Sequence, residues 1–264
     1  MVITNWLSQY IDTDRCNAYK SIMSSAGNCP SEDVLALYCL SHADIFRSKK
    51  VIELGSGYGL AGFVIAAAKE ATEVVISDGN SQVVDYTQRN IEANSGAFED
   101  TVVKSMTLHW NQEDNSNVAD TFDINIAIDC SCDIAVSLKL LIGKYHFLPI
   151  AFFYPFIIWI KISSEKGFSL STFFKDFHRD LARIVKHLLS KAGSSEAIFL
   201  SPKRGYSLDL FLEVAKENGL HFSVMENYDK EVWKRHEGFL NEDRDSWLSY
   251  DKGHHYPLLI RITL

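Results

Sequence analysis

A group of glycines with an acidic residue in front of it occupies the stretch VIELGSGYGLAG, at the end of an apolar run. Gly55, Gly57 and Gly59 can take positive φ there and let the backbone approach a ligand closely. Their spacing is G-x-G-x-G, and Leu60 stands where a dinucleotide fingerprint would have its third glycine. Glu53 precedes the turn, and a carboxylate in that place suits a cationic ligand better than a pyrophosphate. The turn therefore indicates S-adenosylmethionine, which carries an amino group and a sulfonium but no phosphate.

A second carboxylate stands where such a nucleoside would place its ribose. Asp78 ends the apolar run EVVISD, 23 residues after Gly55. A carboxylate at the end of a second strand accepts hydrogen bonds from the ribose hydroxyls. A tight strand–helix turn, with Asp78 as the cap of the next helix, would explain the same residues without a ligand. The combination of Glu53, the glycines and Asp78 favours S-adenosylmethionine as the cofactor.

Two more side chains follow the next two apolar runs. Trp110 comes after VVKSMTLH, where its indole would cover an adenine ring, although an ordinary core or rim Trp would look the same. Asp129 ends FDINIAID, at the edge where open α/β sheets bind their ligands, although a helix cap would also fit. We therefore expect Trp110 and Asp129 to lie in the same crevice as the glycine turn.

The elements that must position these residues alternate between short apolar runs and longer amphipathic segments. Runs rich in Val and Ile that alternate with helices of ten to fourteen residues are typical of βαβ units and a parallel sheet. The last two strands lack a long helical crossover, so we expect them to be antiparallel. The prediction is an α/β fold with a Rossmann-like, seven-stranded, mostly parallel sheet, an antiparallel C-terminal edge pair and helices on both faces. Expected strands are 49–54, 73–80, 102–110, 122–129, 196–202, 220–227 and 256–264; expected helices are 31–46, 60–71, 81–94, 174–193 (ending at Gly193), 207–219 and 229–248.

Composition narrows the classes of function. The net charge of -8 and the pI of about 5.6 argue against a general affinity for nucleic acid. The first residues lack a basic segment followed by an apolar run, so we expect no secretory signal. Five scattered cysteines, an odd number, suggest reduced thiols in the cytosol or nucleus. Cys130 and Cys132 have no second Cys/His pair at ligand spacing, so no metal is expected.

Several motifs together resemble the calmodulin-lysine N-methyltransferases. These motifs are CPSEDVLALYCLSHADIFRSKKVIELGSGYGLAG, VVISDGN, LHW, SPKRG, ENYD and HYPLLI. The resembled family belongs to the seven-β-strand, class I protein-lysine methyltransferases of family 16, and the resemblance covers residues 29–130 and 172–264. It implies a cytosolic or nuclear enzyme that moves methyl groups from S-adenosylmethionine to one lysine of calmodulin. Its implied cofactor residues are Glu53, Gly55, Gly57 and Gly59 at the turn, Asp78 at the ribose, Trp110 at the adenine, and Asp129 at the end of the fourth strand.

The reaction itself predicts a channel for the substrate lysine. Methyl transfer is an in-line displacement, so the amine must arrive neutral and opposite the sulfur, at about 3 Å. An apolar or aromatic channel lowers the pKa of lysine by desolvation, and a carboxylate can orient its nitrogen. Asp129, Phe173 and Phe174 are the candidates for this channel, although Phe173 and Phe174 could simply pack in a helix core. No general base is assigned, because water can accept the proton.

Residues 131–171 interrupt this pattern. Joining Cys130 to Thr172 restores continuous family-like sequence, so the chain is read as an atypical segment at 1–28 and a methyltransferase domain at 29–264 with an insertion. The insertion contains the uncharged run FLPIAFFYPFIIWI at 147–160, which is shorter than the ~20 apolar residues of a spanning helix and contains two prolines. A translated intron or splice product is the leading explanation. A hydrophobic hairpin, an interfacial segment and a membrane-associated variant remain alternatives.

The position of the insertion bears on activity. It directly follows Asp129, where it could block the lysine channel while the glycine turn still binds the cofactor, which would leave a catalytically impaired protein. Because the whole chain is acidic, an acidic partner such as calmodulin would need local basic patches, for which Lys203–Arg204 and Lys234–Arg235 are candidates. The sequence leaves the oligomeric state open.

Overall fold

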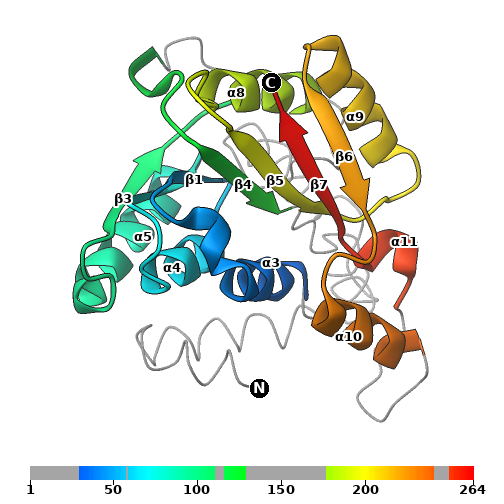
Figure 1. The fold of residues 1–264 in the computed structure, drawn as a ribbon, viewed down its shortest axis with the longest axis horizontal. Coiled ribbons are helices and arrows are strands. Elements are labelled where there is room, and N and C mark those ends of the chain that lie inside the picture. The colour runs from blue at the N-terminus through cyan, green and yellow to red at the C-terminus, as the bar shows by residue number, and fades with distance from the viewer. Residues whose placement is uncertain (1–29, 58, 111–115, 129–176, 241–249) are drawn as a thin grey trace, which may run out of the picture.

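A computed structural model gives the fold, and it describes residues 30–57, 59–110, 116–128, 177–240 and 250–264 (Figure 1). Asp129, Phe173, Phe174, the 1–28 segment and the 131–171 insertion lie outside the described residues. The strands in the described part are β1 (Lys50–Leu54), β2 (Glu73–Asp78), β3 (Val102–Thr107), β4 (Ile124–Ile128), β5 (Glu196–Ser201), β6 (His221–Met225) and β7 (Leu258–Thr263). The helices are α3 (Pro30–Ser41), α4 (Leu60–Ala67), α5 (Ser81–Ala93), α8 (His178–Leu188), α9 (Ser207–Glu217), α10 (Lys230–Leu240) and the short α11 (Lys252–His255).

The described strands form one seven-stranded sheet in the order β3-β2-β1-β4-β5-β7-β6. All neighbours from β3 to β5 pair in parallel, whereas β7 is antiparallel to both β5 and β6. The predicted mostly parallel sheet with an antiparallel C-terminal pair is therefore confirmed. The strand order reverses between β1 and β4, and open α/β sheets bind ligands in the crevice at such a point.

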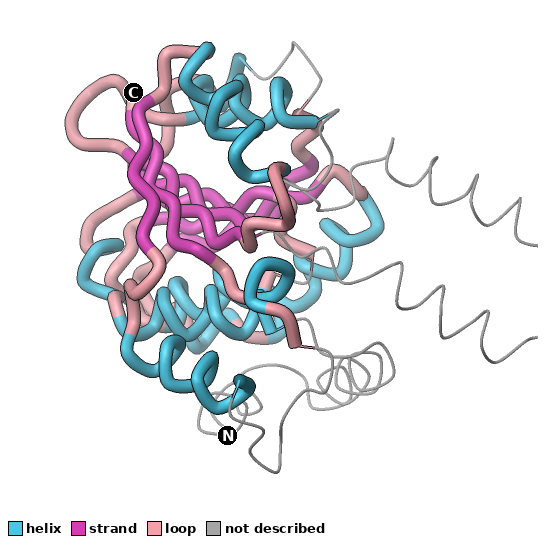
Figure 2. Tube along the Cα trace, turned by 90° about the vertical axis from the view of Figure 1, so that its right-hand side faces the viewer, coloured by secondary structure: helices cyan, strands magenta, loops and turns pink. Residues whose placement is uncertain are grey.

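Helices cover both faces of the sheet (Figure 2). Residues of α3, α4 and α5 pack in one core cluster, and residues of α8 and α9 pack in the other. Successive residues of β1 pack on opposite faces of the sheet. Val51 belongs to the core cluster with α3 and α4, and Ile52 belongs to the cluster with α8 and α9. All five residues of β4 are buried. Burial on both faces is the reason that these strands read as continuous apolar runs rather than as alternating ones.

The helix expected to end at Gly193 ends five residues earlier, at Leu188. Leu189 is extended because it forms a parallel bridge with Phe122, the residue that leads into β4. The Phe122 N–H donates to the Leu188 carbonyl at 3.0 Å, and the Ser190 N–H donates to the Phe122 carbonyl at 2.8 Å. This contact between distant segments ends α8, and Gly193, with φ of 110°, follows in a separate turn.

The C-terminal part also departs in detail from the sequence-based expectation. The helix expected over 229–248 begins at Lys230 and is described as far as Leu240, and the short helix α11 was not predicted. Within the described part of the chain, no helix combines the length and the apolar character that a membrane crossing requires.

Candidate cofactor-binding site

The predicted glycine turn lies at the carboxyl end of β1, beside the point where the strand order reverses (Figure 1). Gly55, Gly57 and Gly59 have φ of 60°, 54° and 77°, so each takes the left-handed conformation that the sequence predicted. The turn is tied to the neighbouring strand, because the Ser56 N–H donates to the Ser77 carbonyl at 2.9 Å. Gly59 lies immediately before α4, so the chain passes directly from the turn into the helix.

Asp78 faces the glycine turn. Its carboxylate accepts hydrogen bonds from the Gly57 N–H at 3.1 Å and from the Asn80 N–H at 2.8 Å, and the residue is 3% exposed. Burial raises the pKa of Asp78 to about 6, although the two N–H donors partly oppose this increase. The alternative that Asp78 caps the next helix is wrong: the cap of α5 is Asn80, whose side chain accepts from the Gln82 N–H at 3.0 Å. Asp78 is instead a buried carboxylate held against the turn.

Glu53 also lies at the turn, but much of its role there is structural. It is 2% exposed, and its Oε2 accepts a hydrogen bond from the Gly62 N–H at 2.9 Å. Gly59, the N-terminal cap of α4, has no side chain to accept from the first turn of the helix. Glu53 therefore supplies from β1 the negative charge that a helix N-terminus favours. The carboxylate that the sequence assigned to a cationic ligand also anchors α4 on the sheet.

Gly62 belongs to this site and was missed from the sequence. A Cβ at position 62 would lie 2.7 Å from Glu53 Oε2 and 2.7 Å from Ile76 Cγ1. Only glycine lets α4 approach β1 and β2 this closely, which is the packing role that the third glycine plays in a dinucleotide fingerprint. The signal was present, since Gly62 is the fourth glycine of VIELGSGYGLAG, but it stands two residues beyond position 60, where a dinucleotide fingerprint has its third glycine.

Replacing Gly62 with alanine is expected to destabilise the protein and weaken cofactor binding together. The added methyl group must displace the Glu53 carboxylate or Ile76, and overpacking of this kind costs about 1–3 kcal/mol. Thermal unfolding with and without S-adenosylmethionine measures both effects. Gly96→Ala is the matched control, because a Cβ there meets nothing within 4 Å. An unfolding temperature for Gly62→Ala equal to that of Gly96→Ala would contradict this account of the packing.

Trp110 lies at the same edge of the sheet. The Leu108 N–H donates to the Asp78 carbonyl at 3.0 Å, which fixes the end of β3 beside the end of β2. Trp110 is half-buried and packs against the core cluster that includes Leu54 and Leu108. The structure thus brings the turn, Asp78 and Trp110 to one edge. The predicted contribution of Asp129, Phe173 and Phe174 falls outside the described residues and stays a prediction.

The site shows no metal-binding chemistry in the part of the chain that the structure describes. Within those ranges, no three His, Cys, Asp or Glu side chains are grouped so that they could hold a metal ion. The polar groups at the turn are backbone N–H donors and two buried carboxylates. The carboxylates are acceptors that suit the hydroxyl and cationic groups of a nucleoside.

The sheet order, the glycine turn after β1 and the carboxylate at the end of β2 define a Rossmann-like α/β fold. Among solved structures, the chain is similar to a branched-chain polyamine synthase from Thermus thermophilus in complex with N4-aminopropylspermidine and 5'-methylthioadenosine. The TM-score is 0.52 with 13% identity, over 87% of this chain and 55% of that one. At this identity the likeness shows the fold alone, and it agrees with the predicted sheet.

Sequence comparison then gives the family. Residues 2–143, more than half of the chain, match the model of the lysine methyltransferase family, and the chain belongs to that family. It is 51% identical over 234 residues to a calmodulin-lysine N-methyltransferase from Arabidopsis thaliana, which covers 89% of this chain and 63% of that protein. It is 27% identical over 132 residues to a protein-lysine N-methyltransferase from Chaetomium thermophilum, covering 48% of this chain and 38% of that protein. The predicted resemblance is confirmed, and the chain spans less than two thirds of the length of these relatives.

Proposed function

We propose that this chain is an S-adenosylmethionine-dependent protein-lysine N-methyltransferase that methylates a lysine of calmodulin. The observation that carries the proposal is the buried Asp78 carboxylate held against the left-handed glycine turn, in a member of the lysine methyltransferase family. The 51% identity to a calmodulin-lysine N-methyltransferase supports calmodulin as the substrate. The net charge of -8 favours a protein over a nucleic acid as the partner.

In this proposal the described residues bind and orient the cofactor. S-adenosylmethionine supplies an electrophilic methyl group when it is bound. Asp78 would accept hydrogen bonds from the ribose hydroxyls, and Trp110 would cover the adenine. Glu53 places negative charge beside the turn and so favours the cationic end of the nucleoside. The left-handed glycines keep Cβ atoms out of the region that the cofactor approaches.

The acceptor side of the reaction stays assigned to Asp129, Phe173 and Phe174. Phe173 and Phe174 would desolvate the substrate amine and lower its pKa, so that it arrives neutral, and Asp129 would orient its nitrogen. We also propose a cytosolic or nuclear location, in keeping with the buried free thiol of Cys39.

The proposed insertion falls within the connection between β4 and α8. The whole connection comprises residues 129–177, which is 49 residues, whereas βα connections commonly have 2–6 residues. Deleting 131–171 removes 41 residues and leaves eight, close to the usual length. Nothing in the sheet order requires the longer connection, because α8 already supplies the crossover from β4 to β5.

Incubation with unmethylated calmodulin and radiolabelled S-adenosylmethionine tests the proposal. We expect label on calmodulin, and a rate that rises about tenfold or more in the variant that lacks 131–171, because misplacement near a lysine channel is costly. Cofactor affinity should be the same in both forms. Absence of label on calmodulin with either form would reject the proposed substrate. A rate that falls on deletion, with cofactor affinity unchanged, would reject the inhibitory role of the insertion.

A further inference from the structure

The loop after β5 lies on the same edge of the sheet as the cofactor turn. At this edge Leu54 of β1 pairs beside Ala127 of β4, and Ile128 of β4 pairs beside Leu200 of β5. Two strand spacings, about 10 Å, therefore separate the end of β1 from the end of β5. The segment SPKRGY, residues 201–206, begins at that point and reaches the start of α9.

This loop adopts an unusual backbone conformation. Arg204 has φ of 42° and Gly205 has φ of 63°, so two successive residues are left-handed and one of them carries a side chain. A non-glycine residue in this region costs free energy, and surrounding contacts must hold it there. The Arg204 N–H donates to the Gly253 carbonyl at 2.7 Å, and its Nε donates to the His254 carbonyl at 3.3 Å. Both contacts fasten the loop to α11.

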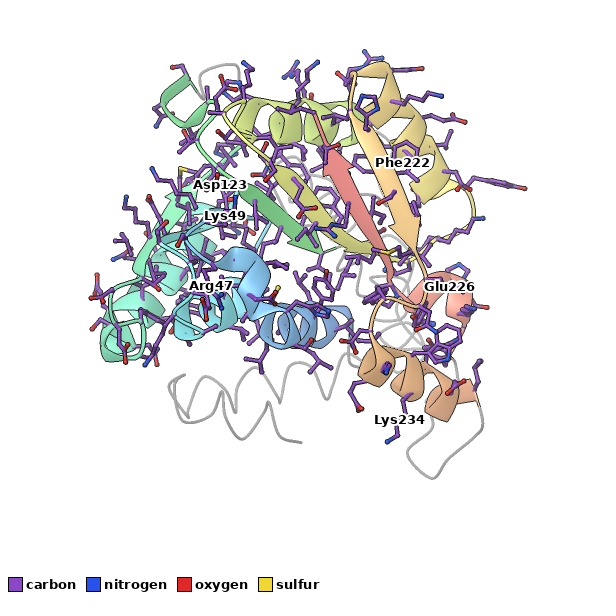
Figure 3. The ribbon with its side chains drawn as sticks, in the orientation of Figure 1. Arg47, Lys49, Asp123, Phe222, Glu226 and Lys234 are labelled. Atoms are coloured by element: carbon purple, nitrogen blue, oxygen red, sulfur yellow. The ribbon has the colours of Figure 1, made fainter. Side chains whose placement is uncertain are left out.

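The helix α11 is itself held firmly. The Lys252 ammonium lies 5.3 Å from the centroid of the Trp233 ring and 5.9 Å from that of Tyr256, and it forms an ion pair with Glu226. The Tyr256 hydroxyl donates to the Glu226 carbonyl at 2.5 Å. Figure 3 shows Glu226 beside α11, near the end of β6. These contacts hold the loop and α11 together as one rim, and a preorganised surface loses less conformational entropy on binding.

The rim exposes side chains that suit an acidic protein. Tyr206 is 80% exposed, more than the other large hydrophobic side chains recorded as exposed in the described part of the chain. Lys203 and Arg204 precede Tyr206 in the same loop, and the Arg204 Nε donates to the His254 carbonyl of α11. The nearest ion-pair partner of Lys203 is Asp209 at 3.8 Å, and both side chains are about half exposed. Such a surface pair contributes little free energy, so Lys203 can exchange Asp209 for a carboxylate of a partner.

We infer that the rim formed by Lys203–Tyr206 and α11 docks the acidic surface of calmodulin beside the cofactor site. This inference rests on the proposed function, since it concerns the same substrate. Tyr and Arg are the residue types that most often dominate the free energy of protein–protein contacts, and here one of each lies on a preorganised loop. On a chain with a net charge of -8, local cations at this edge would also orient an acidic partner toward the cofactor.

The Lys234–Arg235 patch is less suited to this role. Lys234 lies on α10 and points away from the sheet, as Figure 3 shows, and the side chain of Arg235 is outside those that the structure describes. Of the two patches considered from the sequence, only the loop after β5 is placed at the carboxyl edge of a strand next to β4.

Binding and methylation of calmodulin by surface variants of the full chain test the inference. We expect Tyr206→Ala, Lys203→Glu and Arg204→Glu each to raise the Kd for unmethylated calmodulin by about tenfold. The affinity for S-adenosylmethionine should be unchanged in all three variants, and kcat at saturating calmodulin should stay within about twofold. The unfolding temperature should be unchanged in Tyr206→Ala and Lys203→Glu, whereas Arg204→Glu loses the Nε contact to α11 and should unfold at a slightly lower temperature. Because Tyr206 is so exposed, its truncation tests the rim even if the charge reversals disturb the loop.

A second exposed Tyr–Arg pair provides the matched control. Tyr86 and Arg89 lie on α5, on the other side of β1 from β5, with the guanidinium 5.5 Å from the Tyr86 ring centroid. Tyr86→Ala and Arg89→Glu should leave the Kd for calmodulin unchanged. If Tyr206→Ala and Tyr86→Ala gave the same Kd as the parent chain, the docking surface would be rejected. Calmodulin binding that depends on the rim without any methylation would keep the docking surface and reject the proposed function.

Discussion

Replacing Asp78 with alanine is expected to lower the affinity for S-adenosylmethionine by about a hundredfold or more. Two acceptors for the ribose hydroxyls disappear, and each charge-assisted hydrogen bond is worth about 1.5–3 kcal/mol. The Gly57 N–H also loses its acceptor, which loosens the turn at the point where the cofactor approaches. Isothermal titration calorimetry of the variant that lacks residues 131–171 measures the affinity directly.

The matched control for this change is Asp123→Ala. Asp123 also accepts a backbone hydrogen bond across neighbouring strands, from the Lys50 N–H at 2.8 Å, but it lies at the opposite edge of the sheet (Figure 3). Its truncation should reduce stability while leaving cofactor affinity within about threefold, because the lost hydrogen bond is remote from the crevice. If both variants bound S-adenosylmethionine as well as the parent, the assigned cofactor site would be wrong.

Asp78 also predicts how cofactor binding depends on pH. The ionised carboxylate accepts from the ribose hydroxyls, whereas the protonated form loses much of that capacity. Because burial raises the Asp78 pKa to about 6, affinity should be full above this pH and should fall as the pH drops through 6. The same titration on Asp78→Asn should lack this step. If the parent bound S-adenosylmethionine equally well at pH 7 and pH 5, the Asp78 carboxyl would not control cofactor binding in this pH range.

The fold was predictable because the strands that form its centre are buried on both faces. A run such as INIAI in β4 is buried along its whole length, so it does not alternate between apolar and polar residues. The helices that connect successive runs of this kind indicate parallel pairing. The end of α8 was not predictable, since it depends on a bridge to Phe122, 67 residues away from Leu189 in sequence. A local signal, Gly193, suggested a longer helix, and the tertiary contact overrode it.

The candidate site shows the same division between local and non-local information. The left-handed glycines follow from their spacing, because only the local backbone decides them. The close approach of α4 to Ile76 does not follow from the glycine spacing, so Gly62 was not predicted. Both carboxylates lie at the turn, yet their partners depend on which N–H group each one reaches across it. Asp78 accepts from Gly57, and Glu53 accepts from Gly62.

The double role of Glu53 leads to a second large effect. Glutamine at position 53 keeps an oxygen that can accept from the Gly62 N–H, so α4 should stay anchored. The unfolding temperature should fall only slightly, because the lost charge at the helix N-terminus is partly offset by the lower cost of burying a neutral amide. The negative charge beside the turn is lost. Affinity for S-adenosylmethionine should therefore fall by about tenfold to a hundredfold. A hydrogen bond with an ionised partner is roughly twice as strong as one between neutral groups, and the glutamine would no longer attract the cationic end of the cofactor.

Comparing ligands makes this prediction specific to charge. Adenosine has the ribose and the adenine but neither the amino group nor the sulfonium, so its affinity should change by less than about twofold in Glu53→Gln. Asp78→Ala should weaken both ligands, because both carry the ribose hydroxyls. If Glu53→Gln weakened adenosine as much as S-adenosylmethionine, Glu53 would act only by anchoring α4, and its charge would have no part in selecting the cofactor.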